Sequence, residues 1–212
     1  MKYKSLGATG VKVSELCFGT MPFGSDADEK ESGYMFKACR DAGINFFDCA
    51  NVYRGGASEE ILGRLMAAER DDLVITSKCT QVSGDDVNAG GSSRRHIVRS
   101  VEASLQRLNP DRIDVSLMHH FDKSLPTEEI LRALENLVQS GKVLYIGASN
   151  YAAWQVAKAL GISSHRGWPR FDVIQPMYSL VKRQAETEIL PMALSENIGV
   201  IPYSPVGGGA LS

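Results

Sequence analysis

Residues 113–150 include IDVSLMH (113–119), PTEEILRALENLVQSG (126–141) and VLYIGASN (143–150). The first and third segments are short apolar runs. In the middle segment, apolar residues recur at positions 130, 131, 134, 137 and 138, which is the period of an amphipathic helix. Thr127 is predicted to cap the start of this helix, and Gly141 follows its last turn. The stretch therefore predicts a strand, a helix and a second strand.

Similar apolar runs occur five more times along the chain. They are ELCFGT (15–20), NFFDCA (45–50), LVITSK (73–78), FDVIQ (171–175) and IGVIPYS (198–204). Their spacing is about the length of one strand and one helix. The predicted run ends are 26 to 41 positions apart and are read at Gly19, Asp48, Lys78, His119, Ser149, Gln175 and Tyr203. Between them, SRRHIVRSVEASLQRL (93–108) has a helical period, and Ser58 before Glu59 and Glu60 is predicted to open an earlier helix.

Regular alternation of strands and helices predicts an α/β fold with a parallel sheet, either a closed (β/α)8 TIM barrel or an open doubly wound sheet. Two observations favour the barrel. No G-x-G-x-x-G occurs after the first strand, and polar residues end six of the strands, as expected when one rim of a barrel forms the site. Residues 3–14 are expected to form a hairpin around Gly7 to Gly10 that plugs the barrel floor.

The composition excludes several classes of protein. The chain has 212 residues and 43% apolar residues, so it can bury a core, and its formal net charge of -2 argues against binding nucleic acid. No stretch is long and apolar enough to span a membrane, and the N-terminus has no signal segment. Four cysteines without a C-x-x-C pair predict free thiols and a cytoplasmic location.

Four polar residues are expected to gather at the barrel mouth. Asp48, Lys78 and His119 each end an apolar run, and Tyr53 lies five residues beyond Asp48. Such a cluster can work as an acid-base unit in which a cation stabilises the phenolate form of Tyr53. At about 4 Å this attraction is worth up to roughly 4 kcal/mol, and burial of the phenol opposes it.

The chain resembles the aldo-keto reductase family through six segments in the family's order. They are FFDCANVYRGGASEEILG around Asp48 and Tyr53, ITSKC around Lys78, IDVSLMHH around His119, GKVLYIGASNY around Ser149 and Asn150, VIQPMYSL around Gln175, and VIPYSPVGGGALS around Tyr203. The resemblance implies NADPH-dependent reduction of a small-molecule aldehyde or ketone, with NADH left open as the cofactor. It implies that Tyr53 is the general acid, that Lys78 and Asp48 lower its pKa, and that His119 orients the carbonyl.

The resemblance also implies which residues hold the cofactor. Ser149, Asn150 and Gln175 would bind the nicotinamide carboxamide, and Tyr203 would stack on the ring. The start of a loop over the phosphates would follow, formed by Ser204, Pro205, Val206, Gly207 and Gly208.

Other residues near the strand ends suggest further roles. Met21, Phe23, His120 and Phe121 are candidates for lining a substrate pocket, with ordinary loop packing as the alternative. If the strand continues through His119 and His120, the two side chains point to opposite faces, which argues against a shared metal, and no metal site is predicted. Cys49 and Cys79 are expected to be packing residues. Ser149 lies in G-A-S-N, not G-x-S-x-G, which argues against an esterase.

Two alternatives to an active reductase remain. Some relatives of this family act as regulatory subunits of channels, and the cluster is compatible with such a cofactor-binding sensor. In addition, residues 1–212 form a single domain in which only about seven strand-helix units are present, ending in VGGGALS after the seventh strand. We therefore expect a C-terminally incomplete barrel with two unpaired edges, of marginal stability and weak cofactor binding as a free chain. An inactive truncated fragment is thus the second alternative. The natural substrate, the cofactor preference and the oligomeric state stay open.

Overall fold

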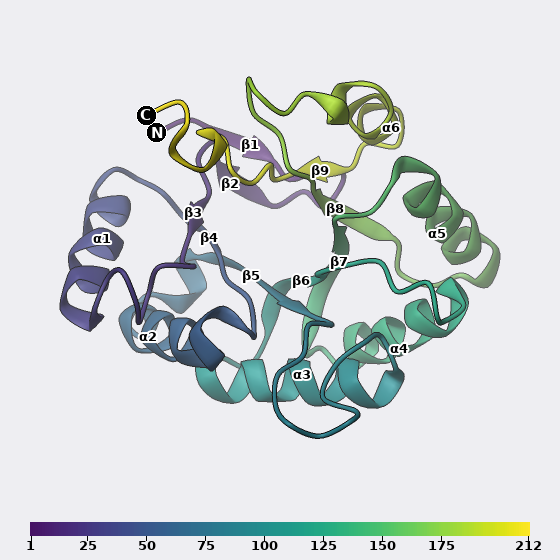
Figure 1. Cartoon of the computed structure of the whole chain (residues 1–212), viewed down its shortest axis with the longest axis horizontal. Helices are drawn as coiled ribbons and strands as arrows, with labels where there is room; N and C mark the ends of the chain where they lie inside the picture. Colours follow the sequence, from purple (N-terminus) through teal and green to yellow (C-terminus); the bar gives the residue numbers. More distant parts are fainter.

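A curled sheet of seven parallel strands forms the centre of the molecule (Figure 1), in a computed structural model that describes residues 1–212. The strands are β3 (Phe18–Gly19), β4 (Phe46–Asp48), β5 (Val74–Cys79), β6 (Ile113–Met118), β7 (Val143–Ser149), β8 (Phe171–Gln175) and β9 (Gly199–Val200). They follow one another in chain order, and the edge strands β3 and β9 do not pair with each other. The sheet is therefore a barrel that remains open along one side.

Six α-helices cover the outside of the sheet (Figure 1). They are α1 (Glu29–Asp41), α2 (Ala57–Met66), α3 (Arg94–Leu108), α4 (Thr127–Gln139), α5 (Ala153–Arg166) and α6 (Ile189–Ser195). Four short 3-10 helices are η1 (Tyr53–Gly56), η2 (Arg70–Asp72), η3 (Gln184–Glu186) and η4 (Gly207–Gly209). The expected repeat is thus confirmed for six units, and a 3-10 turn follows β9 in place of a seventh helix. None of the helices combines the length and apolar character needed to cross a membrane.

The predicted hairpin is formed by two short antiparallel strands, β1 (Tyr3–Ser5) and β2 (Lys12–Ser14). Leu6 and Val13 from this hairpin pack with Phe46 and Val74, which lie at the amino ends of β4 and β5. The hairpin therefore closes the barrel floor, as expected, and leaves the carboxyl ends of the strands free.

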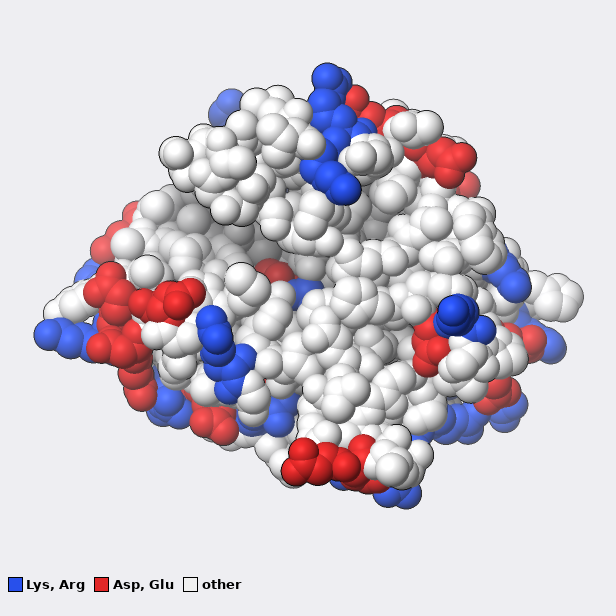
Figure 2. All heavy atoms as spheres, viewed as in Figure 1, with Lys and Arg blue, Asp and Glu red and all other residues white.

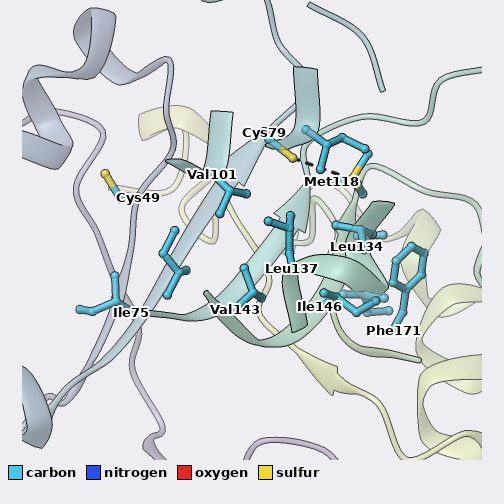
Figure 3. Packing of buried hydrophobic residues seen from close by; sticks show 14 of the residues in the cluster. Cys49, Ile75, Cys79, Val101, Met118, Leu134, Leu137, Val143, Ile146 and Phe171 are labelled. Atoms are coloured by element: carbon cyan, nitrogen blue, oxygen red, sulfur yellow. Dashed lines mark hydrogen bonds between the residues drawn. The ribbon is translucent and has the colours of Figure 1, made fainter. Parts of the chain in front are cut away.

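Alternation along each strand separates two apolar clusters. Val74 on β5 joins the small cluster inside the barrel, whereas Ile75 and Cys79 join the large cluster between sheet and helices. Figure 3 shows Cys49 and Cys79 among this second group, so both are packing residues as predicted. The same alternation sends every second residue near the carboxyl end of a strand into the barrel mouth.

Two predicted helix caps are wrong. Thr127 is the first residue of α4, and Pro126 occupies the capping position without a side-chain hydrogen bond. Ser58 lies inside α2, which begins at Ala57 after a left-handed Gly56. Its hydroxyl donates instead to the backbone oxygen of Thr20 at 2.7 Å, because it is buried against the sheet and does not face the helix end.

The middle of β7 allows a first prediction, because Gly147 faces the barrel interior with no room for a side chain. A Cβ atom there would lie 2.1 Å from the backbone oxygen of Val173 and 2.7 Å from the Leu117 side chain. We expect Gly147→Ala to destabilise the fold by about 3 kcal/mol or more in urea unfolding, at the upper end of overpacking effects. Gly161→Ala in α5 is the matched control, because its Cβ would meet open space and should stabilise the helix by about 0.5–1 kcal/mol. Equal stability of the two variants would contradict this account of the packing.

Candidate functional site

The barrel mouth gathers the polar residues that end neighbouring strands. Asp48, Lys78 and His119 are each an even number of positions beyond an inward-facing apolar residue: Phe46, Val74 and Leu117 respectively. Ser149 and Gln175 are placed in the same way at the ends of β7 and β8. Strand alternation therefore aims the side chains of Asp48, Lys78, Ser149 and Gln175 at one space, and His119 joins them from the position directly after β6.

Asp48 is the centre of a hydrogen-bonded network. The Nζ ammonium of Lys78 donates hydrogen bonds to Oδ2 of Asp48 at 2.6 Å and to the backbone oxygen of Cys49 at 2.7 Å. The other carboxylate oxygen, Oδ1, accepts from the Thr76 hydroxyl and from Nε2 of Gln175 at 3.0 Å. Lys78 is only 2% exposed, so its charge depends on this carboxylate for compensation.

Tyr53 completes the cluster from the loop that follows β4. Its hydroxyl oxygen lies 3.3 Å from Nζ of Lys78, and the same Nζ is 5.0 Å from the centre of the ring. Burial raises the pKa of Tyr53, Lys78 acts to lower it, and Asp48 acts to raise it. The net rise is opposite to the expected lowering, because desolvation of the phenolate outweighs the attraction of Lys78. Tyr53 is therefore protonated at neutral pH.

Lys78 is charged despite its burial. Desolvation acts to lower the pKa of Lys78, but Asp48, followed by Tyr53, favours the ammonium form, and the pKa lies above its ordinary value.

His119 faces Tyr53 across the mouth, with ring centres 6.2 Å apart and nearly perpendicular planes. Burial lowers the pKa of His119 to about 4, helped by the positive charge of Lys78 and by His120. The imidazole is therefore neutral at physiological pH and has one N–H to donate. Its Nδ1 is buried and has no hydrogen-bond partner.

His119 and His120 do not point to opposite faces, because the strand does not continue through them as that expectation required. Their rings are stacked, with centres 5.0 Å apart and planes at 5°. Strand β6 ends at Met118, so strand alternation no longer governs the two histidines. No group of three or more His, Cys, Asp or Glu side chains is arranged to hold a metal ion.

A second polar edge of the mouth comes from β7, β8 and the segment after β9. The Ser149 hydroxyl donates to the backbone oxygen of Gln175 at 2.9 Å, and Asn150 donates to the backbone oxygen of His119 at 2.9 Å. The Tyr203 hydroxyl donates to Oδ1 of Asn150 at 2.8 Å, which holds the ring beside the strand ends. The side-chain amide of Gln175 directs its N–H towards Asp48. Its side-chain oxygen, Oε1, is therefore left to accept from a ligand.

A cavity of about 850 Å³ joins the two edges, and Figure 2 shows this face hollowed near its centre. It brings together most of the predicted site residues. The predicted residues that line it are Met21, Asp48, Tyr53, His119, His120, Ser149, Asn150, Gln175, Tyr203, Ser204, Val206 and Gly208, with Lys78 directly beneath.

Four of the predicted residues lie elsewhere. Phe23 is fully buried against Phe18, and Phe121 packs on Tyr151 and Trp154, so neither lines this cavity. Pro205 lines a different cavity beside the hairpin, and Gly207 packs against Val181. Packing, and not position in the loop, therefore decides which residues reach the mouth.

Sequence reasoning missed several residues of this site, and Thr76 and Arg54 are two of them. Thr76 binds Asp48, and its position two residues before Lys78 in LVITSK could have revealed it by alternation. Arg54 also lines the cavity, and its left-handed backbone conformation gave no signal in the sequence.

The open α/β barrel carries, at the carboxyl ends of its strands, a Tyr-Lys-Asp-His cluster with the geometry of an acid-base site. The family model described as "Aldo/keto reductase family" matches residues 15–212, and the chain belongs to this family. Family membership makes the chain an oxidoreductase, and nicotinamide cofactors are the general rule in the family.

Individual relatives include enzymes and a channel subunit. The chain is 41% identical to "Uncharacterized oxidoreductase YrpG" of Bacillus subtilis and 37% identical to "Versiconal hemiacetal acetate reductase" of Aspergillus parasiticus. It is also 40% identical to "Probable voltage-gated potassium channel subunit beta" of Arabidopsis thaliana. These alignments cover 100% of this chain and 68%, 69% and 66% of the three relatives, respectively. The chain thus spans about two thirds of their length.

Proposed function

We propose that the chain reduces aldehydes or ketones to alcohols with NADPH. The observation that carries this proposal is the position of the Tyr53 hydroxyl, 3.3 Å from the buried ammonium of Lys78 and across the mouth from a neutral His119. A protonated phenol beside a fixed cation can release a proton as negative charge develops on a nearby oxygen. This arrangement suits the protonation of a carbonyl oxygen.

Each residue of the cluster then has a distinct role. A reduced nicotinamide, when bound, supplies the hydride that is added to the carbonyl carbon. Tyr53 gives its proton to the carbonyl oxygen, and Lys78 stabilises the resulting phenolate. Asp48 holds Lys78 in place and keeps it charged. His119 donates an N–H to the carbonyl oxygen, and Met21 and His120 contact the remainder of the substrate.

The second edge of the cavity fits a nicotinamide cofactor. The side-chain oxygen of Gln175 can accept from the N–H groups of a carboxamide. Ser149 and Asn150 lie beside it on the same rim. Tyr203 presents a half-buried ring to the cavity, suited to stacking on a flat heterocycle. Ser204 and Gly208 continue this wall and would hold the phosphates of the cofactor.

The pKa of Tyr53 predicts different pH profiles for the two directions of the reaction. Because this pKa is raised above 10, Tyr53 stays protonated across neutral pH, and we expect kcat/KM for reduction to be constant from about pH 5 to 9. Alcohol oxidation needs the phenolate, whose fraction rises about tenfold per pH unit below the pKa, so oxidation should rise accordingly. Steady-state rates in both directions check this. A reduction rate that falls near pH 7 would contradict it.

The proposed function is tested with the purified chain, 4-nitrobenzaldehyde and NADPH or NADH. The expected result is oxidation of the cofactor that depends on the aldehyde, together with the corresponding alcohol as product. Cofactor binding without any turnover of activated aldehydes would argue against a reductase.

A second candidate function is a cofactor-binding regulatory subunit. It is favoured by the 40% identity to a protein named as a probable potassium channel subunit. The same cluster would then report the redox state of its cofactor to a partner protein. Turnover much slower than cofactor exchange, together with a stable complex with a channel protein, would support this function over that of a metabolic reductase.

A further inference from the structure

The loop that carries Tyr53 is held at its far end by helix α2. After Tyr53, the residues Arg54, Gly55 and Gly56 all have left-handed backbone conformations, with φ of 52°, 65° and 103°. The backbone N–H of Ala57, the first residue of α2, then donates to the backbone oxygens of Tyr53 and Arg54. The position of Tyr53 therefore depends on where α2 begins.

Ser58 ties this helix start to the strand that carries Asp48. It is fully buried, and its hydroxyl donates to the backbone oxygen of Thr20 at 2.7 Å. Thr20 in turn donates its backbone N–H to the backbone oxygen of Asp48 at 2.9 Å. Two hydrogen bonds thus connect α2 with the end of β4.

Glu59 ties the same helix turn to the strand that carries Lys78. It is also fully buried, and it accepts from the hydroxyl of Ser77, the residue before Lys78. Its other oxygen accepts from Nε and Nη2 of Arg107 on α3, at 2.8 and 2.7 Å. Gly56 leaves room for this arginine, because a Cβ there would lie 2.7 Å from the arginine side chain.

We propose that Ser58 and Glu59 are positioning residues that set the distance between the Tyr53 hydroxyl and the Lys78 ammonium. Burying a carboxylate and a hydroxyl is costly unless both are bonded, and apolar residues such as Leu62 and Met66 already pack α2 against the core. Glu59 is bonded to Ser77 on the strand of Lys78, and Ser58 is linked through Thr20 to the end of the strand of Asp48. This clamp, formed by Ser58 and Glu59, therefore joins all three members of the Tyr-Lys-Asp unit. The catalytic part of this inference rests on the proposed function.

The experiment compares four variants of the full chain. Ser77→Ala removes the hydroxyl that β5 donates to Glu59 but leaves the Glu59–Arg107 pair intact. Ser77→Thr keeps a hydroxyl at this position, in a residue type that is common in strands. Glu59→Gln removes the buried charge. Glu60→Gln is the matched control, because Glu60 is the next residue in the helix and is exposed. Urea unfolding identifies the conditions under which every variant is folded.

Two readouts are used on the folded variants. The first is kcat and KM for aldehyde reduction. The second needs no activity: it is the 13Cζ chemical shift of Tyr53 at pH 8, with the signal assigned from Tyr53→Phe.

We expect Ser77→Ala to lower kcat about tenfold and Glu59→Gln about 100-fold, with NADPH affinity changed less than threefold, because small displacements of a reacting group have large effects on rate. Ser77→Thr should recover most of the rate. The Tyr53 signal should shift in Ser77→Ala and Glu59→Gln and should stay at its wild-type position in Glu60→Gln.

Unchanged kcat and an unchanged Tyr53 signal in folded Ser77→Ala would overturn the inference and make the clamp purely structural. A wild-type chain that reduces no aldehyde would count against the proposed function alone. In that case the Tyr53 signal still decides whether the bond between Glu59 and Ser77 positions the ring.

Discussion

Tyr53→Phe is expected to lower the rate of NADPH-dependent aldehyde reduction by about 100- to 10,000-fold, the range typical for loss of a positioned general acid. Phenylalanine keeps the ring that packs at the edge of the core but lacks the hydroxyl beside Lys78. The hydride can still reach the carbonyl carbon, but the developing alkoxide has no neighbouring proton. The loss should therefore appear in kcat, and cofactor affinity should change less than about threefold.

The matched control for this prediction is Tyr145→Phe. Tyr145 also donates its hydroxyl, to the backbone oxygen of Thr9 at 3.2 Å, but it lies near the barrel floor. Its removal should leave kcat within about twofold of the wild type while costing about 1 kcal/mol of stability. If Tyr53→Phe keeps full activity, or if both variants lose activity equally, Tyr53 is not the acid.

Lys78→Met is expected to destabilise the protein by about 3–5 kcal/mol, because it leaves the buried Asp48 carboxylate without its cation. Methionine is similar in length, so the loss is one of charge and not of volume. Thr76 and Gln175 still donate to Asp48, but neither carries a charge. Urea unfolding at pH 7 measures the change, and aldehyde reduction should be lost in the same variant because the phenolate of Tyr53 is no longer stabilised.

A double variant separates charge from packing. Asp48→Asn combined with Lys78→Met removes both buried charges and should recover most of the lost stability without recovering activity. Lys37→Met is the surface control, because the Lys37–Asp41 pair is exposed and should contribute less than about 1 kcal/mol. If Lys78→Met is no less stable than Lys37→Met, the buried pair does not support the fold.

Much of the fold could be predicted because its pattern is local and repeated. The predicted run ends at Gly19, Asp48, Ser149 and Gln175 coincide with the ends of β3, β4, β7 and β8, and those of β5 and β6 differ by one residue. The last run differs more: β9 ends at Val200, and Tyr203 joins only an isolated bridge with Met177. β9 lies at the open edge of the sheet and pairs only with β8, so its backbone pairing ends early.

Strand alternation and the order of the strands follow from the sequence alone, because apolar periodicity and short connections leave few arrangements. Alternation also places Asp48 and Lys78 at one mouth, and His119 directly follows the end of β6. Tertiary packing decided what alternation could not: the stacking of His119 on His120, the burial of Phe23 and Phe121, and the attachment of α2 through Ser58 and Glu59. It also decided the pKa of Tyr53, which depends on desolvation by distant parts of the chain as well as on the nearby charge of Lys78.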